Sequence, residues 1–278
     1  MAKNTVPPSD AARVKAQQMR QAQERADKRT RNIIIGVVAA VVVAVIAVVA
    51  IVVGNQIAKN ARAHDSANTA LLGSYEDGGP IVVSSKGVGV ADDSVPTLTE
   101  YFDYSCHACA DIDGFIGRDL SDGALAGDYT LEIQPVTVVG VEYAGPATTA
   151  SLIVADQAPD HWIEFHHALL AYFGSQYRAG EGRVVSNEEA SWKQVKSIAL
   201  EVGVPQEIVD SFPVNVSDAY LERATNEWRE APIAGREGLG TPEFVKDHST
   251  KIVLSGTDAP SILETIRTGM GLESASAQ

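Results

Sequence analysis

The feature that most constrains this chain is an apolar run from Ile33 to Val53 that contains no charged or amide side chain. At about 1.5 Å per residue, a helix of this length crosses a hydrocarbon core of roughly 30 Å. The alternative is a cleaved signal peptide, because Ala61-Arg62-Ala63 imitates a cleavage site. A signal peptide has an apolar region of about 7–15 residues, and this site lies well past the end of a longer run. We therefore predict a retained transmembrane helix at 33–53.

The distribution of charge predicts how this helix is oriented. Residues 1–32 hold eight basic and three acidic residues, a net charge of +5, whereas the remainder holds 14 basic and 33 acidic residues, a net charge of −19. Basic residues that flank a transmembrane helix stay in the cytoplasm. We expect a single-pass protein of the cell membrane, with residues 1–32 as a cytoplasmic basic arm and an extracytoplasmic C-terminal domain. The acidic exterior excludes nucleic acid as a partner, because phosphate backbones require a basic surface.

The remaining chain reads as a linker, one domain and a short tail. Small, polar and charged residues at 54–78 predict an extracytoplasmic linker, and we place the domain at 79–272 and the tail at 273–278. β-branched and aromatic runs predict strands, and spacings of three and four apolar residues predict helices. The predicted strands are 81–90, 95–104, 129–139 and two short ones near 242–245 and 251–256, and the predicted helices are 106–120, at least three within 145–234, and 260–269.

This order predicts an α/β fold in which a helical insertion, about 145–234, interrupts a mixed sheet. The two cysteines of the chain, Cys106 and Cys109, lie where the second strand meets the next helix. A structural disulfide gains stability with loop size, and this loop is very small. A zinc site lacks the further ligands it needs, because the candidates His161, His166 and His167 share no face with the cysteines. We therefore predict no metal and no cofactor.

A redox site needs one nucleophilic thiol and a second thiol to resolve the mixed disulfide, and the C-x-x-C spacing supplies both. Cys106 would be the attacking thiolate at the positive end of the helix, and Cys109 would be more shielded. His107 adds a partial positive charge that favours the thiolate. The acidic residues nearby oppose this effect, so the net tuning of the thiol stays open: Asp103, Asp111 and Asp113.

The segment EYFDYSCHAC resembles the active-site segment of the DsbA-like thioredoxin-fold oxidoreductases. Three further segments are similar to this family: WIEFHHALLAYF in the insertion, WKQVKSIALEVGV with AYLERATNEWREAPIAG at its end, and the loop GLGTPEFV. The resemblance spans about residues 80–270, and it implies a thioredoxin fold with a Cys106–Cys109 disulfide.

The resemblance also implies that Pro242 follows a cis peptide bond and that the Thr241 backbone lies against the cysteines and binds an extended substrate. An X-Pro bond adopts cis at a cost of only about 0.5–1 kcal/mol. The alternative is an ordinary trans proline that opens a strand.

Glu100 precedes Cys106 by six residues in an apolar strand, and a period of two places it on the same face, beneath the cysteines. The family has a buried acid at this place, which implies that Glu100 accepts a proton from Cys109. The alternative is an edge-strand glutamate that faces solvent.

Two features depart from the family pattern. His107 follows the first cysteine and Ala108 precedes the second, whereas the commonest DsbA motif has Pro and His at these places. Glu243 also puts a negative charge near the expected substrate loop. These departures leave the redox potential open, because the potential depends on how strongly the protein stabilises the reduced thiolate.

The function expected from this resemblance is disulfide formation in unfolded secreted proteins that have reduced cysteines. A membrane-embedded, quinone-linked thiol oxidase would then reoxidise the enzyme. One alternative is a reductase or isomerase on the same fold, although cytochrome-maturation reductases usually have Trp where this chain has Ser105. Another is a non-catalytic thioredoxin-fold adaptor or metal chaperone.

Overall fold

The computed structural model describes residues 19, 45–54, 57–58, 69–213 and 216–272. The chain divides into two compact units, residues 1–58 and 59–278, and each is considered by itself. In the first unit, residues 45–54 form a helix with exposed side chains. Within the described ranges, none of the helices is both long and apolar enough to cross a bilayer. Much of the predicted span at 33–53, almost all of the arm at 1–32 and the tail at 273–278 lie outside the described residues, so these assignments stay predictions.

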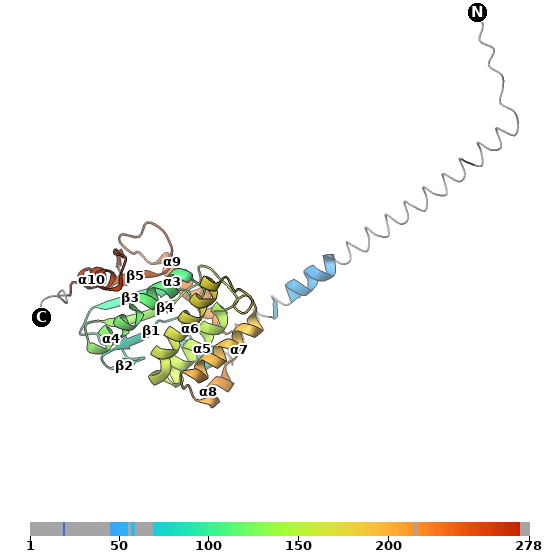
Figure 1. Cartoon of the computed structure of the whole chain (residues 1–278), viewed down its shortest axis with the longest axis horizontal. Coiled ribbons are helices and arrows are strands. Elements are labelled where there is room, and N and C mark those ends of the chain that lie inside the picture. Colours follow the sequence, from blue (N-terminus) through green and yellow to red (C-terminus); the bar gives the residue numbers. More distant parts are fainter. Residues whose placement is uncertain (1–18, 20–44, 55–56, 59–68, 214–215, 273–278) are drawn as a thin grey trace, which may run out of the picture. The chain divides into compact units, whose positions relative to one another are not determined.

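The second unit is built on one mixed sheet of six described strands in the order β2-β1-β4-β3-β5-β6 (Figure 1). Strand β3 (Thr97–Phe102) lies near its centre, parallel to β4 (Thr130–Pro135) and antiparallel to β5 (Glu243–Lys246). Strand β6 (Thr250–Ile252) pairs with β5 at one edge. The mixed α/β sheet that the sequence predicts is therefore confirmed.

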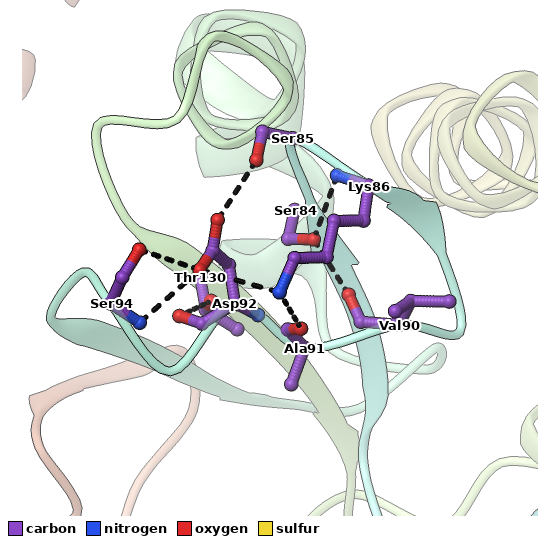
Figure 2. Close-up of polar contacts among 8 residues, drawn as sticks. All are labelled: Ser84, Ser85, Lys86, Val90, Ala91, Asp92, Ser94 and Thr130. Carbon is purple, nitrogen blue, oxygen red and sulfur yellow. Dashed lines mark hydrogen bonds and ion pairs between the residues drawn. The ribbon is translucent and has the colours of Figure 1, made fainter.

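The first predicted strand, 81–90, is wrong in extent, because it folds back as a hairpin. Strand β1 (Ile81–Ser84) pairs antiparallel with β2 (Gly87–Val88), with Ser84 opposite Gly87. Gly87 has φ of +100°, a conformation that a residue with a side chain rarely adopts. The Ser84 hydroxyl also accepts a hydrogen bond from the Lys86 amide, which stabilises the turn (Figure 2).

The loop from β2 to β3 is held in place by Asp92. Its carboxylate accepts hydrogen bonds from the Ser85 hydroxyl and from the amide and hydroxyl of Ser94, and its own amide donates to the Thr130 hydroxyl on β4 (Figure 2). The hydrogen bonds from Ser94 lower the pKa of Asp92 to about 2. The loop after the hairpin is thereby tied to the start of β4, which pairs with β3.

The cysteines lie at the start of a long helix. Helix α3 (His107–Ile112) continues through the π-helical turn η2 (Asp113–Gly117) into α4 (Arg118–Ala126), which ends at Gly127 in the left-handed conformation. The helix predicted at 106–120 is thus present and extends further. Helix α10 (Ala259–Met270) closes the domain, in agreement with the helix predicted at 260–269.

The insertion consists of five described helices that connect β4 to β5. They are α5 (Ala144–Gln157), α6 (Pro159–Ala179), α7 (Glu188–Glu201), α8 (Gln206–Ser211) and α9 (Ser217–Glu230). Helix α5 is apolar nearly all round, and it contacts α6, α7, α8 and α9. The predicted helical insertion at about 145–234 is therefore present, and α6 also contacts α3, which carries the cysteines.

Part of the predicted linker at 54–78 is folded. The 3-10 helix η1 (Ala70–Tyr75) contacts α5, and its Leu72 and Tyr75 side chains are buried in the hydrophobic core. Removing these apolar side chains from water stabilises the folded domain. The folded domain accordingly begins before residue 79.

Candidate active site

The C-terminal end of β3 places the cysteine pair at a strand-to-helix junction. Cys106 is the N-cap residue of α3, with extended backbone angles, and Cys109 lies one turn into the helix. Both are free thiols, and both are buried, Cys106 at 6% exposure and Cys109 at 0%. The unpaired amides at the start of a helix favour a negative charge, and Cys106 occupies that position.

The Thr241-Pro242 segment lies against this pair, as the resemblance implies. The peptide bond between Thr241 and Pro242 is cis. The Cys106 thiol donates a hydrogen bond to the Thr241 carbonyl oxygen, with the two atoms 3.4 Å apart. The pairing of Tyr101 on β3 with Glu243 on β5 explains this contact, because the antiparallel register brings the start of β5 to the end of β3.

The two thiols have opposite electrostatic environments. Hydrogen bonding from Cys109, assisted by Thr241 and the amides of the helix start, lowers the pKa of the Cys106 thiol to about 6 despite partial burial. Burial, together with the hydrogen bond to Cys106, raises the pKa of Cys109 well above its usual range. At neutral pH the pair therefore consists of one thiolate and one thiol, which is the division of labour that thiol–disulfide exchange uses.

Glu100 is buried in the middle of the sheet, at 6% exposure, between Ile133 on β4 and Phe244 on β5. Burial, reinforced by the negative charge of Asp113, raises the pKa of Glu100 to about 8. Such a carboxyl group is protonated at neutral pH and can exchange a proton near that pH. The alternative of a solvent-facing edge glutamate is wrong, because β3 has a neighbour on both sides.

His107 is exposed and lies flat on Tyr177 of α6, with ring centroids 4.4 Å apart and planes 10° from parallel. Hydrogen bonds, and not the His107 imidazole, lower the pKa of Cys106. The insertion thus forms part of the surface beside Cys106, through Tyr177. The sequence alone did not reveal this pairing, because the two residues lie on separate helices.

Asp103 is a further residue of the site, one that the sequence interpretation treated only as a source of negative charge. It is 1% exposed, and one carboxylate oxygen accepts from the amide and hydroxyl of Ser105, directly before Cys106. The other oxygen accepts from the amides of Val138 and Val139 in the loop after β4. Asp103 therefore joins the cysteine turn to the loop after β4.

Glu243 carries the expected negative charge beside the substrate loop, but this charge is buried and paired. Glu243 is 1% exposed, and Trp228 Nε1 donates to its carboxylate at 2.7 Å, while the Arg236 guanidinium donates to both of its oxygens. Burial opposes ionisation, but the hydrogen bonds from Arg236 and Trp228 outweigh it and lower the pKa of Glu243. This carboxylate anchors the start of β5.

The other nearby acids are also partnered. Asp111 accepts a hydrogen bond from Arg178 at 2.8 Å on the surface. Asp113 accepts one from His167 Nδ1 at 2.7 Å, and His166 Nε2 lies 3.8 Å from the same oxygen. Neither histidine approaches the cysteines to form a metal site with them, but together with Asp113 they form a cluster that the sequence did not predict.

Comparisons with known proteins show which solved structures have a similar fold. Neither a protein-family model nor a curated protein sequence matches the chain. Several solved structures match it, including the following two. MdbA, a thiol-disulfide oxidoreductase from Actinomyces oris, is 24% identical with a TM-score of 0.54, over 68% of this chain and 86% of its own. Reduced DsbA from Mycobacterium tuberculosis is 17% identical with a TM-score of 0.50, over 70% of this chain and 94% of its own. From residue 69 onward, the described domain therefore has the DsbA-like thioredoxin fold with its helical insertion.

Proposed function

We propose that this chain is an extracytoplasmic thiol–disulfide oxidase that is anchored in the cell membrane through residues 33–53. The observation that carries the proposal is the asymmetry of the cysteine pair, with the pKa of Cys106 lowered to about 6 and that of Cys109 raised. A stabilised Cys106 thiolate favours the reduced form of the protein, so its disulfide is a stronger oxidant. The two neighbours with this fold are described as a thiol-disulfide oxidoreductase and as DsbA, which supports the same class of chemistry.

The exchange proceeds in two displacements. A substrate thiolate attacks Cys106 in the Cys106–Cys109 disulfide, forms a mixed disulfide with it, and releases Cys109 as a thiolate, which takes up a proton. A second substrate thiolate then attacks the substrate sulfur of the mixed disulfide and releases Cys106 as a thiolate. The substrate has lost two electrons to the enzyme pair and now holds a disulfide.

Two groups support these steps. The carboxyl group of Glu100 beneath the sheet end exchanges protons with Cys109, consistent with its pKa of about 8. The Thr241 backbone, whose carbonyl oxygen lies 3.4 Å from Cys106 Sγ, binds an extended segment of the substrate.

The substrates are unfolded secreted proteins with reduced cysteines, and a membrane-embedded quinone-linked thiol oxidase restores the disulfide.

The test is the redox equilibrium of the full-length protein with glutathione buffers, read by trapping free thiols. An oxidase has a potential near that of DsbA, about −120 mV, whereas thioredoxin lies near −270 mV. A value at the thioredoxin end would overturn the oxidase assignment in favour of a reductase. An intermediate value together with scrambled-ribonuclease reactivation would favour an isomerase.

A second experiment separates catalysis from binding. The Cys109→Ser variant retains the attacking thiolate but cannot resolve a mixed disulfide. Its Cys106 thiolate should attack disulfides of oxidised secreted proteins, release one substrate thiolate, and accumulate covalent complexes that dithiothreitol releases. The Cys106→Ser variant should form none and should lose insulin-reduction activity. Unchanged partner binding by Cys106→Ser, with no redox activity in the parent chain, would instead identify an adaptor.

A further inference from the structure

A buried cluster of metal-ligating side chains lies apart from the cysteine pair. Asp113 begins the π-helical turn η2, and His166 and His167 lie on α6. The carboxylate oxygen of Asp113 and one ring nitrogen of each histidine all lie within 4.8 Å of one another. Both histidines are nearly inaccessible, at 4% and 6% exposure, and the Asp113 side chain is 8% exposed.

The hydrogen bonds around His166 determine which of its nitrogens carries the proton. The Tyr104 hydroxyl donates to Ser151 Oγ at 2.8 Å, so it accepts from His166 Nδ1, also at 2.8 Å. His166 Nε2 then carries a lone pair that points toward an Asp113 oxygen 3.8 Å away. Two electron-rich atoms thus face each other in a buried site, an arrangement that a cation between them would stabilise.

His167 supplies the third ligand atom. Its Nδ1 lies 2.7 Å from the same Asp113 oxygen, and its Nε2 lies 3.4 Å from Ser121 Oγ. When a cation replaces the proton on Nδ1, the proton moves to Nε2, which donates to Ser121. A hydrogen-bonded second ring nitrogen is the arrangement by which proteins orient histidine ligands.

The local backbone is shaped around this cluster. A Cβ atom at Gly117 would lie 2.2 Å from Asp113 Oδ1 and 3.0 Å from His167 Cε1, so only glycine leaves room for the two side chains. Single π-helical turns such as η2 are frequent at functional sites. Asp113 and His167 also line a cavity of about 480 Å³, together with Asp119 and the ion pair of Arg118 and Glu164. This cavity provides a route for an ion and room for a water ligand.

We propose that Asp113, His166 and His167 bind one Zn²⁺ ion, with a water molecule from the adjoining cavity in the fourth position. Two imidazoles and a carboxylate suit zinc, which takes three protein ligands and a water in open tetrahedral sites. Mg²⁺ and Ca²⁺ prefer sites made of oxygen ligands alone. The ion would join α6 of the insertion to the helix that carries the cysteines.

Zinc binding is tested on the full-length Cys106→Ser/Cys109→Ser chain in detergent, because reduced cysteines bind zinc themselves. Equilibrium dialysis against Zn²⁺, followed by elemental analysis, should give one zinc ion per chain, and zinc should raise the unfolding temperature. Mg²⁺ and Ca²⁺ should do neither. X-ray absorption at the zinc edge should show nitrogen and oxygen ligands only. The absence of zinc from this chain after dialysis would overturn the proposal.

Variants locate the ion. His167→Gln and Asp113→Asn should each weaken zinc binding at least tenfold, whereas His161→Gln, on the same helix but outside the cluster, should not. Circular dichroism identifies variants that fold. If His167→Gln unfolds, Asp113→Asn and the absorption spectrum still decide the matter. Full zinc affinity in a folded Asp113→Asn or His167→Gln variant would place the ion elsewhere and refute the site.

Discussion

The Cys106 thiol and the Thr241 carbonyl oxygen lie 3.4 Å apart, although 135 positions separate the two residues in the chain. The antiparallel register of β3 and β5, with Tyr101 opposite Glu243, brings them together. A backbone carbonyl beside the reactive sulfur can accept a hydrogen bond from a substrate peptide during thiol–disulfide exchange. The reactivity of Cys106 therefore depends on residues from two distant parts of the chain.

Alkylation should report the lowered pKa of Cys106. Because the pKa is about 6, iodoacetamide should label the reduced protein with a rate that reaches half its maximum near pH 6, whereas an ordinary thiol reaches it near pH 8.5. The Cys109→Ala variant should shift the midpoint upward, since Cys109 supplies the largest stabilising hydrogen bond and alanine has no donor to replace it. A midpoint near 8.5 in the parent protein would contradict this assignment.

The stability of the reduced protein should depend on pH through the same thiol. Since the folded pKa of Cys106 lies below the unfolded value of about 8.5, its stabilising contribution is present above that value and is lost as the pH falls through 6. The free energy of unfolding of the reduced form, minus that of the oxidised form, should therefore rise between pH 6 and pH 8.5. Urea unfolding of both forms measures this difference. A difference that falls between pH 6 and pH 8.5 would contradict a lowered pKa of Cys106.

The titration of Glu100 should make the protein less stable as the pH rises, which is opposite to the effect of Cys106. The folded pKa of Glu100, about 8, lies above its unfolded value, so the native state holds a proton that the unfolded state has lost, and stability falls as the pH rises from about 4.5 to 8. In a Cys106→Ser/Cys109→Ser background, Glu100→Gln should remove this decline and stabilise the protein above pH 8 by up to about 4 kcal/mol. Equal stability of the two proteins at pH 5 and pH 9 would show that Glu100 does not titrate as argued.

Asp103→Asn should destabilise the domain and disturb the cysteine turn. The amide can no longer accept hydrogen bonds at both positions, and bonds to a charged group contribute about 1.5–3 kcal/mol each. We expect a loss of about 2–4 kcal/mol in urea unfolding and a higher midpoint for Cys106 alkylation. Asp111→Asn is the matched control, because its exposed ion pair with Arg178 contributes at most about 1 kcal/mol.

Arg236→Met should leave the Glu243 carboxylate buried without its main partner. Removal of one member of a buried ion pair costs about 3–5 kcal/mol, and the Arg236 side chain is only 9% exposed. Lys193→Met, which breaks an exposed pair with Glu189, should change stability by less than about 0.5 kcal/mol. Similar effects of the two substitutions would mean that Glu243 does not depend on Arg236.

Local patterns were sufficient to predict much of this fold. β-branched and aromatic runs predict β3 and β4, and apolar spacings of three and four residues predict α6 and α10. The strand predicted at 81–90 ran through Ser84-Ser85-Lys86-Gly87, although these residues favour a turn. A two-residue turn at Ser85 and Lys86 reverses the chain there. Composition also placed η1 in a linker, since its burial depends on contact with α5, far along the chain.

By itself, the sequence determined the C-x-x-C pair at a strand-to-helix junction, the insertion and the Thr241-Pro242 loop, because these are encoded in neighbouring residues. Only the tertiary structure decided how charges are satisfied: Glu243 is neutralised by Arg236, Asp103 accepts hydrogen bonds from two loops, and Asp113 meets His167. The residue type gives the formal charge of a side chain, but the free energy of that charge in the folded protein depends on its burial and its partners. Those partners lie on other elements, and the folded chain alone brings them within hydrogen-bond distance.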